Sequence, residues 1–197
     1  MRIKFIKILS ILFILQLFFG CLTFRLKYTI PVASSSKIGK VILIVDDQRD
    51  PDKGGNDPLA IGITRSTIWV PFTMKASPGN EPLKVMREMI SSCLLAAGYE
   101  VVDESNKAPV LHAILNDFWS DGYAHNRMVL KMRVELIKEI DSSPLWISFV
   151  DVNEGATATW SVRDFGRGYN KMLETTKNKL LTDFNLKEFY NAYISIK

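Results

Sequence analysis

The 197-residue sequence has few of the side chains from which metal centres and nucleophilic sites are built. It contains two cysteines and two histidines. Cys21 and Cys93 form no Cys-x-x-Cys pair, which argues against a zinc site and against a disulfide-rich scaffold. His112 and His125 lack the spacing of metal ligands, and no Gly-x-Ser-x-Gly turn or complete phosphate-binding loop is present. The sequence therefore predicts no metal, no cofactor and no catalytic residue.

The first twenty residues contain no acid, and they predict an export signal. Three bases, Arg2, Lys4 and Lys7, precede an apolar run at 8–19. A basic start followed by about 7–15 apolar residues is typical of a secretory signal peptide, whereas a transmembrane helix needs about 20. We therefore expect residues 1–20 to be removed on export. An uncleaved membrane anchor is the alternative.

The end of this segment, residues 17–21, is Leu-Phe-Phe-Gly-Cys and resembles a bacterial lipobox. In that motif the signal is cut after a small residue, here Gly20, and the next cysteine, here Cys21, is acylated. Phenylalanines stand where the motif usually has Leu and then Ala or Ser. An ordinary secretory signal with an isolated cysteine is therefore the alternative.

Lipidation would give the protein a durable attachment to membrane lipid, because three acyl chains hold far better than one. Leu22, rather than Asp, follows the cysteine, which resembles lipoproteins sorted to the outer membrane. An acylated Cys21 would leave Cys93 without a disulfide partner. Cys93 lies in an apolar helical stripe, so we expect a buried and inert thiol there.

The positive charge of the chain belongs mainly to the export segment. The whole sequence has 25 Lys and Arg against 21 Asp and Glu, a net charge of +4. Three of those bases lie in residues 1–20, so the mature chain has 22 bases, 21 acids and a charge of +1. A basic protein could bind nucleic acid through its phosphates, but this mature chain is nearly neutral. The sequence predicts no nucleic-acid partner.

Hydrophobic periodicity predicts a short lipidated tether at 21–39 and one domain at 40–197. Strands are expected at 41–45, 61–75, 99–102, 110–119 and 128–138, with further strand material at 145–152 and 156–162, and helices at 82–97 and 169–184. This pattern predicts an α+β fold in which a mainly antiparallel sheet packs against one long central helix and a C-terminal helix. The expected order is β-β-α-β-β-β-β-α.

Three local features are candidate sites. The Asp-rich loop at 46–57 lacks two ligand positions of a calcium-binding loop, which favours an ordinary solvated loop. The sequence Gly-Arg-Gly at 166–168 favours a turn before the last helix over an anion site. Four aromatics fall at predicted strand ends and turns and form a possible interaction surface, with edge packing as the alternative: Trp119, Tyr123, Trp146 and Trp160.

The order of these elements resembles the YajG-like lipoproteins, small envelope lipoproteins of Gram-negative bacteria. The matching pieces are the lipobox, the strand 41–45 running into Asp47-Gln48-Arg49, the Ile61-Gly62 pair, the helix 83–97 ending in Gly98-Tyr99, the segment Pro109–Asp117 and the helix 169–184. The resemblance covers about residues 40–184. It implies no enzymatic activity, no cofactor and no site residue beyond the lipidated cysteine.

These observations predict a lipoprotein of the bacterial outer membrane that faces the periplasm. Its small, non-catalytic domain would bind another envelope component. One alternative is an accessory subunit of an envelope transport or assembly complex. The other is a small-ligand-binding or hydrolytic envelope protein, which would require Asp46, Asp47 and Asp117 to converge in one cleft.

Overall fold

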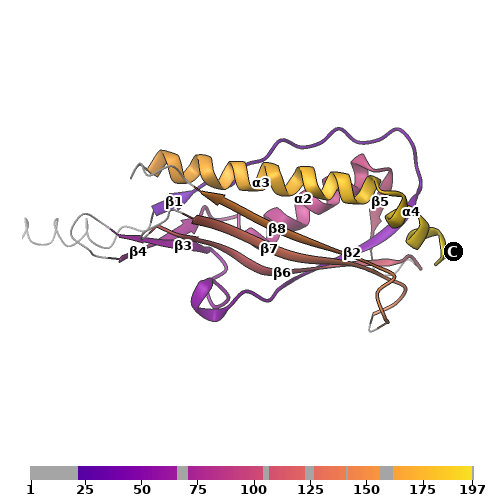
Figure 1. Ribbon diagram of the computed structural model, residues 1–197, viewed down its shortest axis with the longest axis horizontal. Coiled ribbons are helices and arrows are strands. Elements are labelled where there is room, and N and C mark those ends of the chain that lie inside the picture. Colours follow the sequence, from indigo (N-terminus) through magenta and orange to yellow (C-terminus); the bar gives the residue numbers. More distant parts are fainter. Residues whose placement is uncertain are drawn as a thin grey trace, which may run out of the picture.

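Eight strands form one mixed sheet, and the helices lie on one of its faces (Figure 1). The computed structural model describes residues 22–65, 71–103, 107–122, 127–140, 142–155 and 162–196. The strands are β1 (Leu22–Phe24), β2 (Gly39–Asp47), β3 (Ala60–Arg65), β4 (Pro71–Ala76), β5 (Tyr99–Val102), β6 (Val110–Asp121), β7 (Arg127–Ile137) and β8 (Trp146–Gly155). The helices are α2 (Pro82–Ala96), α3 (Val162–Asn185) and α4 (Lys187–Ile194), with a 3₁₀ turn η1 (Pro51–Lys53).

Strand β6 lies at the centre of the sheet. Along one edge it pairs with β7 in an antiparallel register from Val110↔Ile137 to Asp121↔Arg127, and β7 pairs with β8 in the same way. Along its other edge, the first half of β6 pairs with β2 and its last residues pair with β3, both parallel. The longest pairings are thus antiparallel. Strand β5 lies outside β2, and β4 and β1 lie outside β3.

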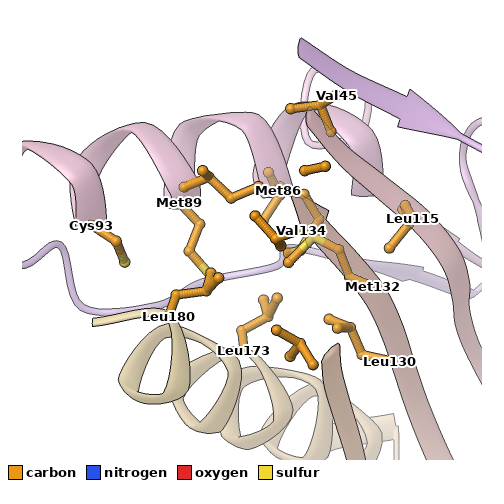
Figure 2. Packing of buried hydrophobic residues seen from close by; sticks show 14 of the residues in the cluster. Val45, Met86, Met89, Cys93, Leu115, Leu130, Met132, Val134, Leu173 and Leu180 are labelled. Carbon is orange, nitrogen blue, oxygen red and sulfur yellow. The ribbon is translucent and has the colours of Figure 1, made fainter. Parts of the chain in front are cut away.

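The core fills the space between the sheet and the two long helices. Strand β7 alternates buried apolar residues with more exposed ones, as a sheet with one covered face requires. Figure 2 shows Met86 and Met89 of α2 and Leu173 of α3 pointing toward Leu130 and Met132 of β7. All five are at most 2% exposed. Helices α2 and α3 therefore cover this face of the sheet, and we call the opposite face the open face.

The α+β class and the central helix were predicted, whereas the stated order of elements was only partly right. Helix α2 begins at Pro82 and is followed by Gly98 at φ +92°, as expected of a helix bracketed by these residues. Helix α3, with 24 residues, is longer than the central helix α2, with 15. The predicted strand at 61–75 contains two strands, β3 and β4, with residues 66–70 outside the described ones.

Residues 22–38, expected to form a tether, instead pack along the domain. Strand β1 pairs in parallel with β4, and Phe24 and Leu26 are about 5% exposed. Farther along, the backbone N–H of Ser34 donates to the carbonyl of Leu95 at 3.0 Å. Figure 1 shows this segment passing over the helices toward β2. The tether prediction therefore fails for residues 22–26, where β1 pairs with β4 and two side chains are buried, whereas Ile30 and Val32 farther along are 71% and 89% exposed.

The region before the last helix also differs from the prediction. One strand, β8, spans 146–155, and residues 156–161 lie outside the described ones. Helix α3 begins at Val162, so Gly166, Arg167 and Gly168 lie inside the helix and not in a turn before it. Their N–H groups therefore belong to the helix and form no anion-binding loop. Glycine is a poor helix former, so Gly166 and Gly168 led the sequence prediction to begin this helix too late.

Candidate functional site

A groove of about 1090 Å³ opens at the end of the sheet where β2 and β6 begin and β7 ends. We call it the distal groove. It is lined by Gly39, Lys40, Ile42, Lys107, Ala108, Pro109, Val110, Lys138, Glu139, Ile140, Tyr193 and Ile196. These residues come from four parts of the chain that the sheet register and the C-terminal helix bring together.

The floor of the distal groove continues the apolar centre of the open face. Ile42, Val110 and Ile137 lie in register on β2, β6 and β7 and form a cluster separate from the main core. Each is at most 7% exposed. At the rim, by contrast, Ile140 is 63% exposed, far more than a branched aliphatic side chain usually is. The groove therefore offers apolar contact area that the domain itself does not cover.

The rim of the distal groove is mainly basic. Lys40, Lys107 and Lys138 are exposed, and the one acid in the lining is Glu139. Among the described residues, none of these three ammonium groups forms an ion pair. A ligand that combined carboxylate or phosphate groups with an apolar part would match both the rim and the floor.

The second uncovered surface is the part of the open face along β8. Strand β8 pairs with β7 only, so its other edge has no strand partner within the described part of the chain. Phe149 is 67% exposed and Ile147 is 41% exposed, both on the open face. Free strand edges with apolar side chains are sites where another chain can add a strand.

The Asp-rich loop at 46–57 is held in place by an arginine at its start, Arg49. The Arg49 guanidinium is buried and grips the Asp47 carboxylate through Nε–Oδ1 at 2.9 Å and Nη2–Oδ2 at 2.8 Å. Its Nη1 donates to the carbonyl oxygen of Ala60 at 2.9 Å. Arg49 thus joins the end of β2 to the start of β3, and the Asp-x-Arg pattern has a structural role here.

The three acids that an enzyme would need occupy different environments. Asp46 lies on the open face and contacts Nε2 of His112 at 2.7 Å, whereas Asp47 is held by Arg49. Asp117 is half-buried, and its Oδ1 has no hydrogen-bond partner. Desolvation raises the pKa of Asp117 above its ordinary value, although Lys53 and Lys131 oppose the rise. Neither the distal groove nor the cleft lined by Ile42, Arg87 and Asp103 contains any of these three acids.

The predicted aromatic surface is divided by the fold. Trp146 packs on the core, with ring centroids 4.8 Å from Phe189 and 6.2 Å from Phe184. Trp119 is half-buried on the open face beside Val129 of β7. Tyr123 and Trp160 lie outside the described residues, as do Gly20 and Cys21 of the lipobox.

Cys93 is fully buried, as expected, and burial raises the pKa of its thiol to about 12. No three His, Cys, Asp or Glu side chains in the described ranges are arranged to hold a metal ion. None of the helices in those ranges has the length and apolar character to cross a membrane. Sequence reasoning did not identify the distal groove, since its lysines are scattered along the chain and only the sheet register brings them together.

This geometry describes a small α+β domain with an uncovered groove and an open sheet face, and comparisons with known proteins agree with the fold. No protein-family model matches the chain, and no curated protein matches it. Among solved structures it is similar to the protein XCC0632 from Xanthomonas campestris, described as family-model DUF330. The two share 10% identity with a TM-score of 0.59, over 89% of this chain and 99% of that one.

A second solved structure, described as an uncharacterized protein, has 5% identity and a TM-score of 0.50. The match covers 83% of this chain and 99% of that one. At such identities the likeness shows a shared fold and nothing about activity. Neither structure is described as YajG-like, so that resemblance stays a prediction.

Proposed function

We propose that the protein is a lipid-anchored lipoprotein of the bacterial cell envelope whose non-catalytic domain binds another envelope component through the distal groove. The observation that carries the binding proposal is the groove itself, where three exposed lysines surround an apolar floor. Folding alone gives no reason to leave Ile140 63% exposed beside this floor. Covering Ile140 is therefore a gain that a partner in the groove would obtain.

The chemistry of the groove specifies the kind of partner. Three ammonium groups against one carboxylate favour a segment that carries negative charge. Because Ile42 and Val110 lie at the bottom, apolar side chains on the same segment would contribute burial energy. We propose an acidic, partly apolar segment of an envelope protein. Attachment of both molecules to one membrane would raise their effective concentration.

The anchor rests on the lipobox-like residues 17–21 and is tested apart from binding. Radiolabelled palmitate should label the wild-type protein, and Cys21→Ser should abolish the label and release the protein from the membrane fraction. Cys93→Ser is the matched control, since Cys93 is buried and should not affect labelling. An unlabelled wild-type protein whose membrane fraction is unchanged in Cys21→Ser would contradict the anchor.

Binding is tested by photocrosslinking in cells. A photoreactive residue placed at Lys138 or Ile140 should capture one defined envelope protein, whereas the same residue at Lys84 or Glu88, exposed positions on α2, should not. Exchange of Lys40, Lys107 and Lys138 for glutamate should abolish capture from Ile140. Equal capture from the α2 positions would contradict a partner in the groove.

A second candidate function is that of an accessory subunit of an envelope transport or assembly complex. The exposed Phe149 and the strand edge of β8 favour it, because a neighbouring subunit could extend the sheet there. Phe149→Lys should then abolish co-purification of a stoichiometric partner. The groove lysines should have no effect on that complex, which separates the two candidates.

A further inference from the structure

Six strands begin or end at one end of the domain, and helix α3 begins there as well. Strand β1 runs parallel to β4 with Leu22 beside Met74, so both strands begin at this end. Strand β3 ends there, because it is antiparallel to β4 and Arg65 pairs with Pro71.

The long strands reach the same end. Strand β6 ends there at Asp121, which pairs with Arg127, the first residue of β7. Strand β8 ends there too, because its last residue, Gly155, also pairs with Arg127. We call this the proximal end. Figure 1 shows these strand ends together, far from α4.

Helix α3 begins at the proximal end too. Glu154, next to the last residue of β8, contacts Lys171 at 2.7 Å in the first half of the helix and Thr175 at 3.0 Å just past its middle. Ser148, near the start of β8, donates to Asp183 near the end of the helix at 2.5 Å. The helix therefore runs antiparallel to β8, and its first turns lie at the proximal end.

The point of lipid attachment in the proposed function lies at this same end. Strand β1 begins at Leu22, the residue after Cys21, and consecutive Cα atoms are about 3.8 Å apart. Residues 22–24 pair with β4, so the chain enters the sheet directly after Cys21. No flexible segment separates an acylated Cys21 from the sheet.

The proximal end carries three arginines alongside the acids Asp121 and Asp164. Arg127 and Arg163 are exposed, and the Arg167 side chain is 65% exposed. Arg167 contacts Asp164 at 3.6 Å, and Arg127 donates to the uncharged Asn153 at 2.7 Å. Guanidinium groups in such positions can contact lipid phosphates.

We propose that the proximal end rests on the membrane surface, with the sheet held upright by direct attachment at Cys21. This inference depends on the anchor in the proposed function and adds the orientation of the domain. The distal groove then lies at the far end of β7, roughly 33 Å along the strand, where it faces away from the lipid. A partner would reach it from the aqueous side.

The test places single fluorescent labels on the purified, full-length lipoprotein in vesicles of phosphatidylethanolamine and phosphatidylglycerol with a quencher on the lipid headgroup. Two matched pairs are used, Arg127→Cys with Lys138→Cys at the two ends of β7, and Arg163→Cys with Lys187→Cys along the helices. All four positions are exposed, and the native Cys93 is buried and should not take the label.

We expect strong quenching at Arg127 and Arg163 and little at Lys138 and Lys187. A flexible Gly-Ser insert of ten residues between Cys21 and Leu22 should reduce the quenching at Arg127 and Arg163, because the domain could then reorient. Equal quenching at both ends, or no effect of the insert, would overturn the proposed orientation. Mass spectrometry of the same sample reports acylation of Cys21, so a failed anchor, which would overturn both proposals, is recognised separately.

Discussion

The hydroxyl of Tyr193 accepts a hydrogen bond from the backbone N–H of Lys40 at 2.9 Å and donates one to the Lys40 carbonyl at 3.2 Å. Tyr193 belongs to the last helix and is 2% exposed, and Lys40 is the second residue of β2. A methyl group at Gly39 would lie 1.8 Å from the same hydroxyl. Glycine at 39 is therefore what lets the C-terminal helix close on the sheet and form one wall of the distal groove.

Tyr193→Phe should reduce the free energy of unfolding by about 1 kcal/mol, because it removes both hydrogen bonds and keeps the ring. Gly39→Ala should cost more, roughly 1–3 kcal/mol, because the added methyl displaces Tyr193. Urea unfolding followed by circular dichroism measures both. A Gly39→Ala protein as stable as wild type would show that the helix does not need this close approach.

The ion pair between Asp47 and Arg49 gives a second prediction. Asp47→Ala leaves a buried guanidinium unpaired and should lower the free energy of unfolding by up to roughly 3 kcal/mol, since the Asp47 side chain keeps 20% exposure. Arg49→Lys should also destabilise, because an ammonium group cannot grip both carboxylate oxygens and the Ala60 carbonyl together.

The control for this pair is Lys75→Met, which breaks the more exposed contact between Lys75 and Asp57 at 2.7 Å. That pair should contribute no more than about 1 kcal/mol. Chemical denaturation of all three variants makes the comparison. If Asp47→Ala cost no more than Lys75→Met, Arg49 would not be what joins β2 to β3.

Close approach of β3 to β6 depends on Gly62. A methyl group there would lie 2.5 Å from the carbonyl oxygen of Ser120 and 2.7 Å from the side chain of Met74. Gly62→Ala should therefore cost roughly 1–3 kcal/mol of stability, measured by thermal unfolding. Gly155→Ala is the control, since a methyl at Gly155 meets nothing within 4 Å. Equal melting temperatures for the two variants would contradict this prediction.

The elements that the sequence predicted well are those whose local pattern agrees with their packing. Helix α2 has a proline at its start, a glycine after its end and one apolar stripe, and the alternation along β7 marks its covered face. Strand β1 carries no such pattern. Its three residues become a strand only because β4, some fifty residues later, lies beside them.

The site was less predictable than the fold for a related reason. Lys40, Lys107 and Lys138 are far apart in the sequence, and none belongs to a motif. They converge because β2, β6 and β7 share one register. The Asp-x-Arg pattern can be read from the sequence. That Arg49 links β2 to β3 follows only from its hydrogen bond to the Ala60 carbonyl in the structure.

Cys93 gives a prediction of reactivity. It is fully buried, and burial raises the pKa of its thiol to about 12, so almost no thiolate is present at neutral pH. The native protein should react with a thiol-specific dye far more slowly than the protein in denaturant does. Timed absorbance measurements on Cys21→Ser, which leaves Cys93 as the one thiol, test this. Rapid native reaction would show that α2 opens readily from α3.

Asp117 predicts a component of stability that declines as pH rises. Desolvation raises the pKa of Asp117 in the folded protein above its ordinary value of 3.8, so the folded state binds its proton more tightly than the unfolded state does. Ionisation therefore disfavours folding. Asp117→Asn, which cannot ionise, should gain stability relative to wild type as the pH increases through the raised pKa.

Asp57 should show the opposite trend and serves as the matched control. Hydrogen bonding to Lys75 lowers the pKa of Asp57, so its ionised form stabilises the fold and that contribution is lost as the pH falls. Urea unfolding of wild type, Asp117→Asn and Asp57→Asn between pH 3 and pH 7 should thus give stability differences that change in opposite directions. If the difference between Asp117→Asn and wild type did not change with pH, burial of the Asp117 carboxylate would not disfavour its ionised form in the folded protein.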